Sequence, residues 1–333
     1  MKLYKPLKAN IWHGRIDEPN DVDSLRWHQV VKQIDLPRYE VSENRNYRKT
    51  ICFIGFKSDA GVKENLGRVG AAKAPDAIRK EMSNLPLLNN EILLLDAGDI
   101  VCKNDLQQAQ KELGQAVEKI LSLGMFPVVI GGGHETTLGN YLGVSNFLKN
   151  KEVNYDLGII NFDAHFDLRP YNGKPSSGNM FSQIVDICKN EKQKFHYYVI
   201  GLQKTGNTRS LFNKADNLNV RYELAKNITA NSLMEIYERI DKFVSENNKM
   251  YATLCADVIS SAYAPGVSSP QPFGMNPELI LNLLKYVIKS GKVCSFDVAE
   301  VVPRYDNDRN TAKLIAIIIY AIINELVVEV IQD

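Results

Sequence analysis

The sequence predicts an α/β fold with a mostly parallel central sheet that helices cover on both faces. Short apolar runs recur along the chain, and longer amphipathic runs separate them. The short runs are continuously apolar, which is typical of strands that are buried on both faces. Strands that alternate with helices are typical of parallel sheets. At 333 residues the chain is long for one domain, but α/β folds of this size occur as one unit.

The predicted strands are Thr50–Phe56, Ile92–Asp96, Phe126–Ile130, Leu157–Phe162, Tyr197–Gly201, Tyr251–Ala256 and Lys292–Val298. Helical patterns lie between them, for example in Asp105–Leu123, Leu233–Glu246 and Glu278–Ser290. The apolar run Leu314–Ile323 is shorter than the roughly 20 residues of a membrane span, so it predicts a buried C-terminal helix. Polar, weakly periodic residues 1–48 are expected to form an N-terminal extension that wraps the surface or makes an oligomer contact. Residues 49–333 are expected to form a single domain.

Composition narrows the possible partners and the compartment. The 40 basic and 39 acidic residues give a net charge of +1, which does not favour nucleic acid as a partner. The five cysteines are scattered and form no CxxC pair, which indicates a reducing compartment. The first residues lack the apolar core of a signal peptide. We therefore expect a cytoplasmic protein that does not bind membranes.

Histidine and acidic side chains follow three of the predicted strands. They lie in GGGHE (131–135), NFDAHFD (161–167) and CADVISSAYAPG (255–266), and they are His134, Asp163, His165, Asp167 and Asp257. The carboxyl ends of strands in such sheets are where ligands bind, so these segments are expected to converge on one pocket. Imidazole nitrogen and carboxylate oxygen together suit a divalent ion such as manganese, iron or zinc.

Each of these motifs also has a simpler interpretation. In an extended segment, residues 163, 165 and 167 would project to one face; alternatively, Asp163 caps a helix. The glycines at 131–133 could form an anion-binding turn, but they lack the spacing and the Lys-Ser/Thr of a P-loop. Cys255, two residues before Asp257, is either a buried small hydrophobe or a group that binds a metal.

Together the three stretches resemble the ureohydrolase superfamily, which contains arginase, agmatinase, formimidoylglutamase and guanidino-acid hydrolases. The resemblance extends from about residue 50 to 325. GGGHE, DAHFDLR, SSGNMFSQ, APGVSSP, GLQKTGNT (201–208) and the segment 59–79 are most similar to the formimidoylglutamase branch. DVAEVVPRYDNDRNTAKLIA (297–316) resembles the superfamily's C-terminal acidic motif. The resemblance implies an arginase-like three-layer α/β/α fold.

The resemblance also implies a site for two manganese ions. His134, Asp163 and Asp167 would hold one ion, and Asp163, His165 and Asp257 would hold the other. The family has a second bridging aspartate at the position of Cys255. Because a thiolate is softer than a carboxylate, Cys255 makes Zn²⁺ or Fe²⁺ possible in place of Mn²⁺.

The reaction implied is metal-dependent hydrolysis of N-formimidoyl-L-glutamate to L-glutamate and formamide, a step of histidine degradation. A hydroxide that bridges the two ions would attack the formimidoyl carbon. Asp167 would carry the proton, and Glu300, in DVAEVVP, would hydrogen-bond the cationic imino nitrogen. Outside the family context, Glu300 would be an exposed acid after a strand.

The substrate of this reaction carries two carboxylates. Arg169 is the first candidate to bind them, because arginine binds carboxylate bidentately, and Arg68 is the second. Arg169 could equally be a surface arginine. Neutral donors are expected from Ser177, Gly178 and Asn179.

Two other functions stay open. The first is a guanidino-substrate hydrolase, agmatinase- or arginase-like, that releases urea. Arginases carry a histidine in the stretch similar to SGNMF, where this chain has Phe181. The second is a metal-poor, catalytically silent relative, which Cys255 favours. Superfamily members are usually oligomers, so we expect a homo-oligomer with a small acidic amidine as its substrate.

Overall fold

A computed structural model describes residues 1–7, 10–40, 47–151 and 155–327 of the chain. Within them, ten strands form one sheet in the order β1-β4-β3-β5-β10-β9-β6-β7-β8, with β2 also paired to β4. The strands are β1 (Tyr4–Lys5), β2 (Lys32–Gln33), β3 (Lys49–Lys57), β4 (Ile92–Val101), β5 (Phe126–Ile130), β6 (Leu157–Phe162), β7 (His196–Leu202), β8 (Arg221–Leu224), β9 (Lys249–Cys255) and β10 (Val293–Ala299). The pairs are parallel, apart from the antiparallel pair of β1 and β4.

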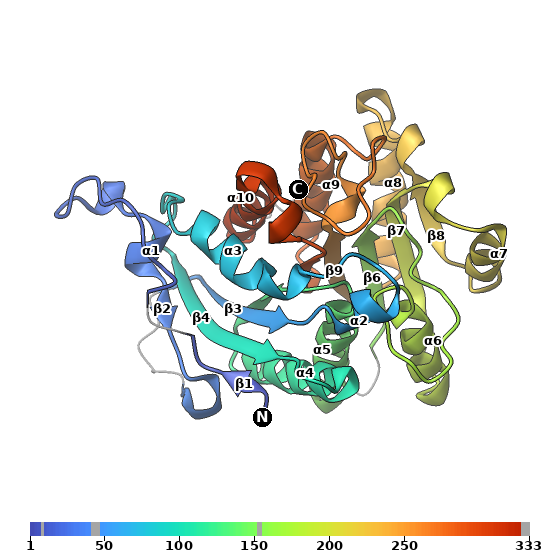
Figure 1. Cartoon of the computed structure of the whole chain (residues 1–333), viewed down its shortest axis with the longest axis horizontal. Helices are drawn as coiled ribbons and strands as arrows, with labels where there is room; N and C mark the ends of the chain where they lie inside the picture. Colours follow the sequence, from blue (N-terminus) through green and yellow to red (C-terminus); the bar gives the residue numbers. More distant parts are fainter. Residues whose placement is uncertain (8–9, 41–46, 152–154, 328–333) are drawn as a thin grey trace.

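Helices cover both faces of this sheet (Figure 1). The helices of the described residues are α1 (Trp27–Val30), α2 (Ala60–Glu64), α3 (Ala74–Met82), α4 (Leu106–Ser122), α5 (Thr136–Lys151), α6 (Met180–Asn190), α7 (Arg209–Asn217), α8 (Leu233–Ser245), α9 (Pro277–Lys289) and α10 (Asn310–Glu325). Helices α3, α8, α9 and α10 pack in one apolar core on one face of the sheet, and α4 to α7 pack in a second core on the other face. The predicted three-layer α/β/α architecture with a mostly parallel sheet is therefore confirmed.

Most predicted elements agree with the observed ones to within one or two residues, and the apolar run Leu314–Ile323 lies inside α10. The strand predicted at Ile92–Asp96 instead continues to Val101. It continues because Arg79 of α3 is fully buried and neutralises the polar end of the strand, donating to the carboxylates of Asp96 and Asp99. Sequence analysis did not predict β8, a short edge strand whose residues are only partly buried.

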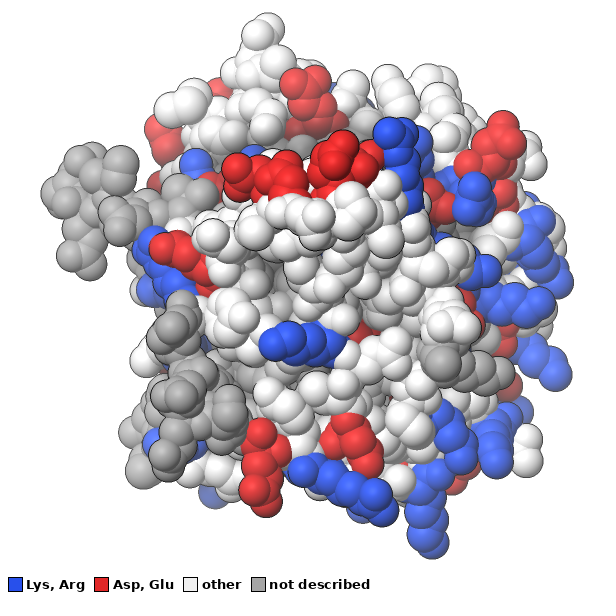
Figure 2. All heavy atoms as spheres, turned by 90° about the vertical axis from the view of Figure 1, so that its left-hand side faces the viewer, with Lys and Arg blue, Asp and Glu red and all other residues white. Residues whose placement is uncertain are grey.

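The described residues before position 49 join the same sheet and core. Strands β1 and β2 pair with β4, and the indoles of Trp12 and Trp27 are buried. Figure 2 shows the side of the molecule on which these N-terminal elements lie, where acidic and basic side chains surround a largely uncharged middle. Residues 8–9 and 41–46 of the predicted extension lie outside the described residues. The division of the chain at residue 49 and the oligomer contact stay predictions.

The strand order brings four chain segments together. Strands β5, β10, β9 and β6 are consecutive neighbours in the sheet and run parallel. The residues that follow them therefore emerge side by side at one edge, although the four segments lie far apart in the sequence. None of the helices in the described ranges is both long enough and apolar enough to cross a bilayer.

Candidate metal centre

His134 reaches the carboxyl edge of the sheet on the glycine turn between β5 and α5. The amide of Gly133 donates to the carbonyl of Ser58 at 2.9 Å, and a Cβ on Gly132 would lie 1.8 Å from the same oxygen. Only glycine permits this approach of two backbones. The turn leaves the imidazole of His134 buried, with Nδ1 3.0 Å from Asp163 Oδ2 and 2.9 Å from Asp167 Oδ2.

The DAHFD segment converges on His134 through a turn. It leaves the strand after Phe162, and Asp167 has a left-handed backbone with φ of +49°. The prediction that residues 163, 165 and 167 lie along an extended segment is therefore wrong, because the chain bends at residues 164–165 and Asp167 is left-handed. The turn nonetheless brings both carboxylates to one nitrogen of His134.

Cys255 and Asp257 complete two overlapping groups of donor atoms. In each group the donor atoms lie within 4.8 Å of one another; the groups are His134, Asp163 and Cys255, and Asp163, His165 and Asp257. Asp163 belongs to both. Asp257 Oδ2 is 3.2 Å from His165 Nδ1, while its Oδ1 is buried and has no hydrogen-bond partner in the described part of the chain. Two donor groups that share one carboxylate are the arrangement expected for two neighbouring ions.

The electrostatics of the cluster fit a cation. Burial, together with the nearby charge of Asp163, raises the pKa of Asp167 to about 6. Burial and the surrounding carboxylates also raise the pKa of the Cys255 thiol. Burial alone would lower the pKa of His134, but the Asp163 and Asp167 carboxylates raise it well above its usual range. The raised pKa of Asp167 reflects like charges held close together in a buried site, which a bound cation would offset.

Two glutamates lie next to the cluster. Glu300 follows β10 with φ of +67°, and its Oε1 accepts the amide hydrogen of His134 at 2.8 Å. Its Oε2 is buried without a hydrogen-bond partner among the described residues. Glu135, which sequence analysis did not single out, accepts from Ser58 Oγ and from the Gly61 amide, both at 2.9 Å. In the sequence, the position of Glu135 directly after His134 was the feature that could have indicated its place near the site.

A cavity of about 290 Å³ opens onto these groups. It is lined by Asn65, Leu66, Gly67, Arg68, His134, His165, Asp167, Arg169, Ser177, Cys255, Asp257, Ser268, Ser269 and Glu300. The side chain of Arg68 donates to the backbone carbonyls of Val267 and Ser268, whereas Arg169 is exposed at the wall.

Asn179 is not among the residues that line this cavity, and its role in substrate binding stays a prediction. Its Oδ1 accepts from the Ser176 amide and from Gln183, and its Nδ2 donates to the carbonyl of Lys174. These hydrogen bonds brace the loop before α6. Phe181 is buried, and its ring packs edge-on against the His134 imidazole with centroids 6.1 Å apart.

The fold and the cluster together define an α/β protein with a candidate site for two metal ions at the carboxyl edge of a parallel sheet. The sequence model of the arginase family matches residues 49–324, and the chain belongs to this family. The family predicted from the sequence motifs is thus confirmed.

Several relatives match over almost their whole length. The chain is 46% identical over 326 residues to the formimidoylglutamase of Clostridium tetani, covering 97% of this chain and 96% of that protein. It is 43% identical over 319 residues to the formimidoylglutamase of Legionella pneumophila strain Paris, covering 95% and 96%.

Solved structures show the same fold. The formimidoylglutamase of Bacillus subtilis superposes with a TM-score of 0.76 at 20% identity, covering 94% of this chain and 95% of that one. The formiminoglutamase of Trypanosoma cruzi, crystallised with Mn²⁺, superposes with a TM-score of 0.74 at 23% identity, covering 89% and 99%.

Proposed function

We propose that the chain is a hydrolase of the arginase family that cleaves N-formimidoyl-L-glutamate to L-glutamate and formamide. The observation that carries this proposal is the pair of donor groups that share Asp163 at the base of an arginine-bearing cavity. The chain-long similarity to the formimidoylglutamase of C. tetani supports the choice of substrate.

Two Mn²⁺ ions are the proposed cofactor, and manganese is present in the T. cruzi structure. His134, Asp163, Asp167 and Cys255 would hold one ion; Asp163, His165 and Asp257 would hold the other. When bound, such a pair supplies Lewis acidity and a nucleophile from water at neutral pH. The sulfur of Cys255 makes Zn²⁺ or Fe²⁺ the alternative.

The reaction adds water across the bond between the formimidoyl carbon and the glutamate nitrogen. A C–O bond forms, that C–N bond breaks, and formamide leaves with the original imino nitrogen. The departing amine needs a proton, and Asp167, in the cavity wall beside His134, is placed to carry it from the attacking water. Glu300 would accept an N–H of the amidinium through its Oε2, which has no hydrogen-bond partner in the described part of the chain.

Arg169 is proposed as the main partner of the substrate carboxylates. Its guanidinium is exposed at the cavity wall, whereas the donors of Arg68 are partly committed to the 267–268 backbone. Ser177 lines the same wall and adds a hydroxyl donor. Acidic substrates are favoured because bidentate binding by arginine selects for carboxylate.

A substrate panel tests the proposal. The purified chain, stripped and reloaded with Mn²⁺, is expected to release formamide and glutamate from N-formimidoyl-L-glutamate, and Glu300→Gln is expected to reduce kcat/KM about a hundredfold. Release of urea from agmatine, arginine or a guanidino acid, with no reaction of formimidoylglutamate, would contradict it. Full loading with metal but no turnover of any of them would favour the silent alternative. A cytoplasmic location and a homo-oligomeric assembly remain part of the proposal.

A further inference from the structure

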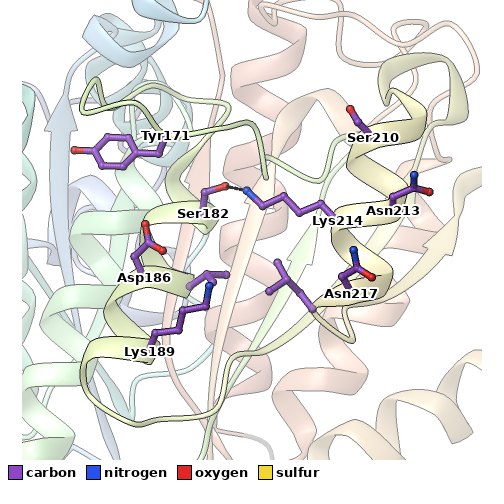
Figure 3. A pocket seen from close by; sticks show the side chains of 10 residues that line it. Tyr171, Ser182, Asp186, Lys189, Ser210, Asn213, Lys214 and Asn217 are labelled. Carbon is purple, nitrogen blue, oxygen red and sulfur yellow. Dashed lines mark hydrogen bonds between the residues drawn. The ribbon is translucent and has the colours of Figure 1, made fainter.

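A second cavity, of about 490 Å³, lies between α6 and α7 on the outer side of the 163–169 segment. Figure 3 shows its lining: Ser182, Asp186 and Lys189 lie on α6, and Lys214 extends from α7 toward Ser182. Lys189 is exposed, whereas Lys214 is half-buried with its ammonium group directed inward.

The ammonium group of Lys214 contacts the backbone that carries two proposed active-site residues. Nζ donates to the carbonyl of Leu168 at 2.9 Å and to Ser182 Oγ at 2.7 Å. The Ser182 hydroxyl in turn donates to the carbonyl of Arg169 at 2.8 Å. Lys214 therefore holds two consecutive carbonyls, one directly and one through Ser182.

The segment between Asp163 and Arg169 needs such support. Asp167 has a left-handed backbone, which costs a residue with a Cβ about 1–3 kcal/mol and persists only where its surroundings hold it. The neighbouring backbone polar groups are held by side chains, as when Tyr197 donates to the carbonyl of Phe166. Lys214 contributes the charged donor of this set, and hydrogen bonds from charged groups are about twice as strong as neutral ones.

The location of Lys214 also argues for a specific role. A lysine at this place on α7 could stay exposed, as Lys189 of α6 is in the lining of the same cavity. Burial lowers the pKa of Lys214, so holding the ammonium group here has a cost that its two hydrogen bonds offset.

We infer that Lys214 is a positioning residue, which holds the Leu168 and Arg169 carbonyls and thereby sets the places of Asp167 and Arg169 in the active site. This inference rests on the proposed function for the roles of those two residues. It assigns Lys214 no contact with substrate, since its ammonium group acts from the far side of the backbone.

The test compares Lys214→Met, which keeps the length of the stem, with Lys214→Arg and with the control Lys189→Met. For Lys214→Met we expect kcat/KM per metal-loaded folded molecule to fall about tenfold, mainly through a higher KM, with a weaker affinity for Mn²⁺. Lys214→Arg restores a charged donor and is expected to recover most of the loss. Lys189→Met is expected to match the wild type.

A merely structural lysine would give a different pattern. In that case Lys214→Met would lower the melting temperature but leave KM and Mn²⁺ affinity unchanged, and the inference would be overturned. If Lys214→Met does not fold, Ser182→Ala removes the hydrogen bonds that link Lys214 to the Arg169 carbonyl and leaves the bond to Leu168, and an unchanged KM in that variant overturns the inference. If the wild type does not cleave formimidoylglutamate, the proposed function fails, and Mn²⁺ affinity alone decides the role of Lys214.

Discussion

Two buried clusters of carboxylates in this molecule are stabilised in opposite ways. In β4, Asp96 and Asp99 accept from the guanidinium of Arg79, Trp12 also donates to Asp96, and Lys57 Nζ lies 2.8 Å from Asp99. At the carboxyl ends of β6 and β9, carboxylates and a thiol gather around two histidines, and one carboxylate oxygen of Asp257 has no partner within the described ranges.

The difference separates a structural from a functional use of buried acids. In the Arg79 cluster, Arg79 and Lys57 neutralise Asp96 and Asp99, so no metal ion is needed there. The cluster around Asp163 lacks an internal lysine or arginine partner among the ion pairs of the described residues, and we propose that a divalent ion completes it. Burial alone therefore does not mark a metal site; an uncompensated charge does.

The largest expected effect is that of Arg79→Met. Removing the guanidinium leaves Asp96 and Asp99 buried without their main cation, so the free energy of unfolding should fall by about 3–5 kcal/mol. Urea denaturation of the metal-free protein measures it. Adding Asp96→Asn to Arg79→Met is expected to recover part of the loss. A loss below about 1 kcal/mol for Arg79→Met alone would mean that the cluster is not held together by this charge.

Binding of Mn²⁺ at the cluster around Asp163 should stabilise the folded protein. At a free Mn²⁺ concentration of about 100 times Kd, the free energy of unfolding should rise by about 2.7 kcal/mol. Asp163→Asn removes the carboxylate that both donor groups share and should abolish the rise. Urea denaturation with and without Mn²⁺ measures this rise in the free energy of unfolding, and a chelator should reverse it. An equal rise in Asp163→Asn would place the metal elsewhere.

Cys255→Asp tests whether the sulfur of Cys255 is a metal ligand in the cluster around Asp163. Because carboxylate suits Mn²⁺ better than thiolate, the substitution should raise Mn²⁺ affinity about tenfold, or about 1.4 kcal/mol. The Co²⁺-loaded wild type should show a sulfur-to-metal charge-transfer band that the variant lacks. If the wild type shows no such band, the sulfur is not a ligand and Cys255 is a buried small side chain.

The smallest expected effect is the acid response of the Arg79 cluster. Burial alone would raise the pKa of Asp99, but Arg79 and Lys57 lower it below 3.8. As the pH falls, the Asp99 carboxylate is therefore protonated in the unfolded chain before it is protonated in the folded protein. The stabilisation from Asp99 is complete above its unfolded pKa of about 3.9. It is lost as the pH falls through the lower folded pKa. Unfolding curves between pH 5 and about 3 should show less acid sensitivity in Asp99→Asn than in the wild type.

The sequence predicted the fold well because a doubly covered parallel sheet imposes continuous apolar strands, which are visible in FPVVI and LGIINF. It also predicted which residues meet, because parallel strands end at a common edge. It did not predict how they meet: Asp167 is left-handed, and the next carbonyl, of Leu168, accepts a hydrogen bond from Lys214, which is distant in sequence. The buried Arg79 was missed for a similar reason, since an apolarity pattern does not reveal a charge that a distant strand neutralises.

The place of β10 in the sheet has a consequence for the synthesis of the protein. This strand, near the end of the chain, lies between β5 and β9, which are made earlier. Until residues 293–299 leave the ribosome, His134 and Asp257 stand at the ends of strands with no common neighbour. The donor group His134, Asp163 and Cys255 spans the ends of β5, β6 and β9, so its assembly in the sheet depends on β10, whereas the group Asp163, His165 and Asp257 follows β6 and β9, which pair directly.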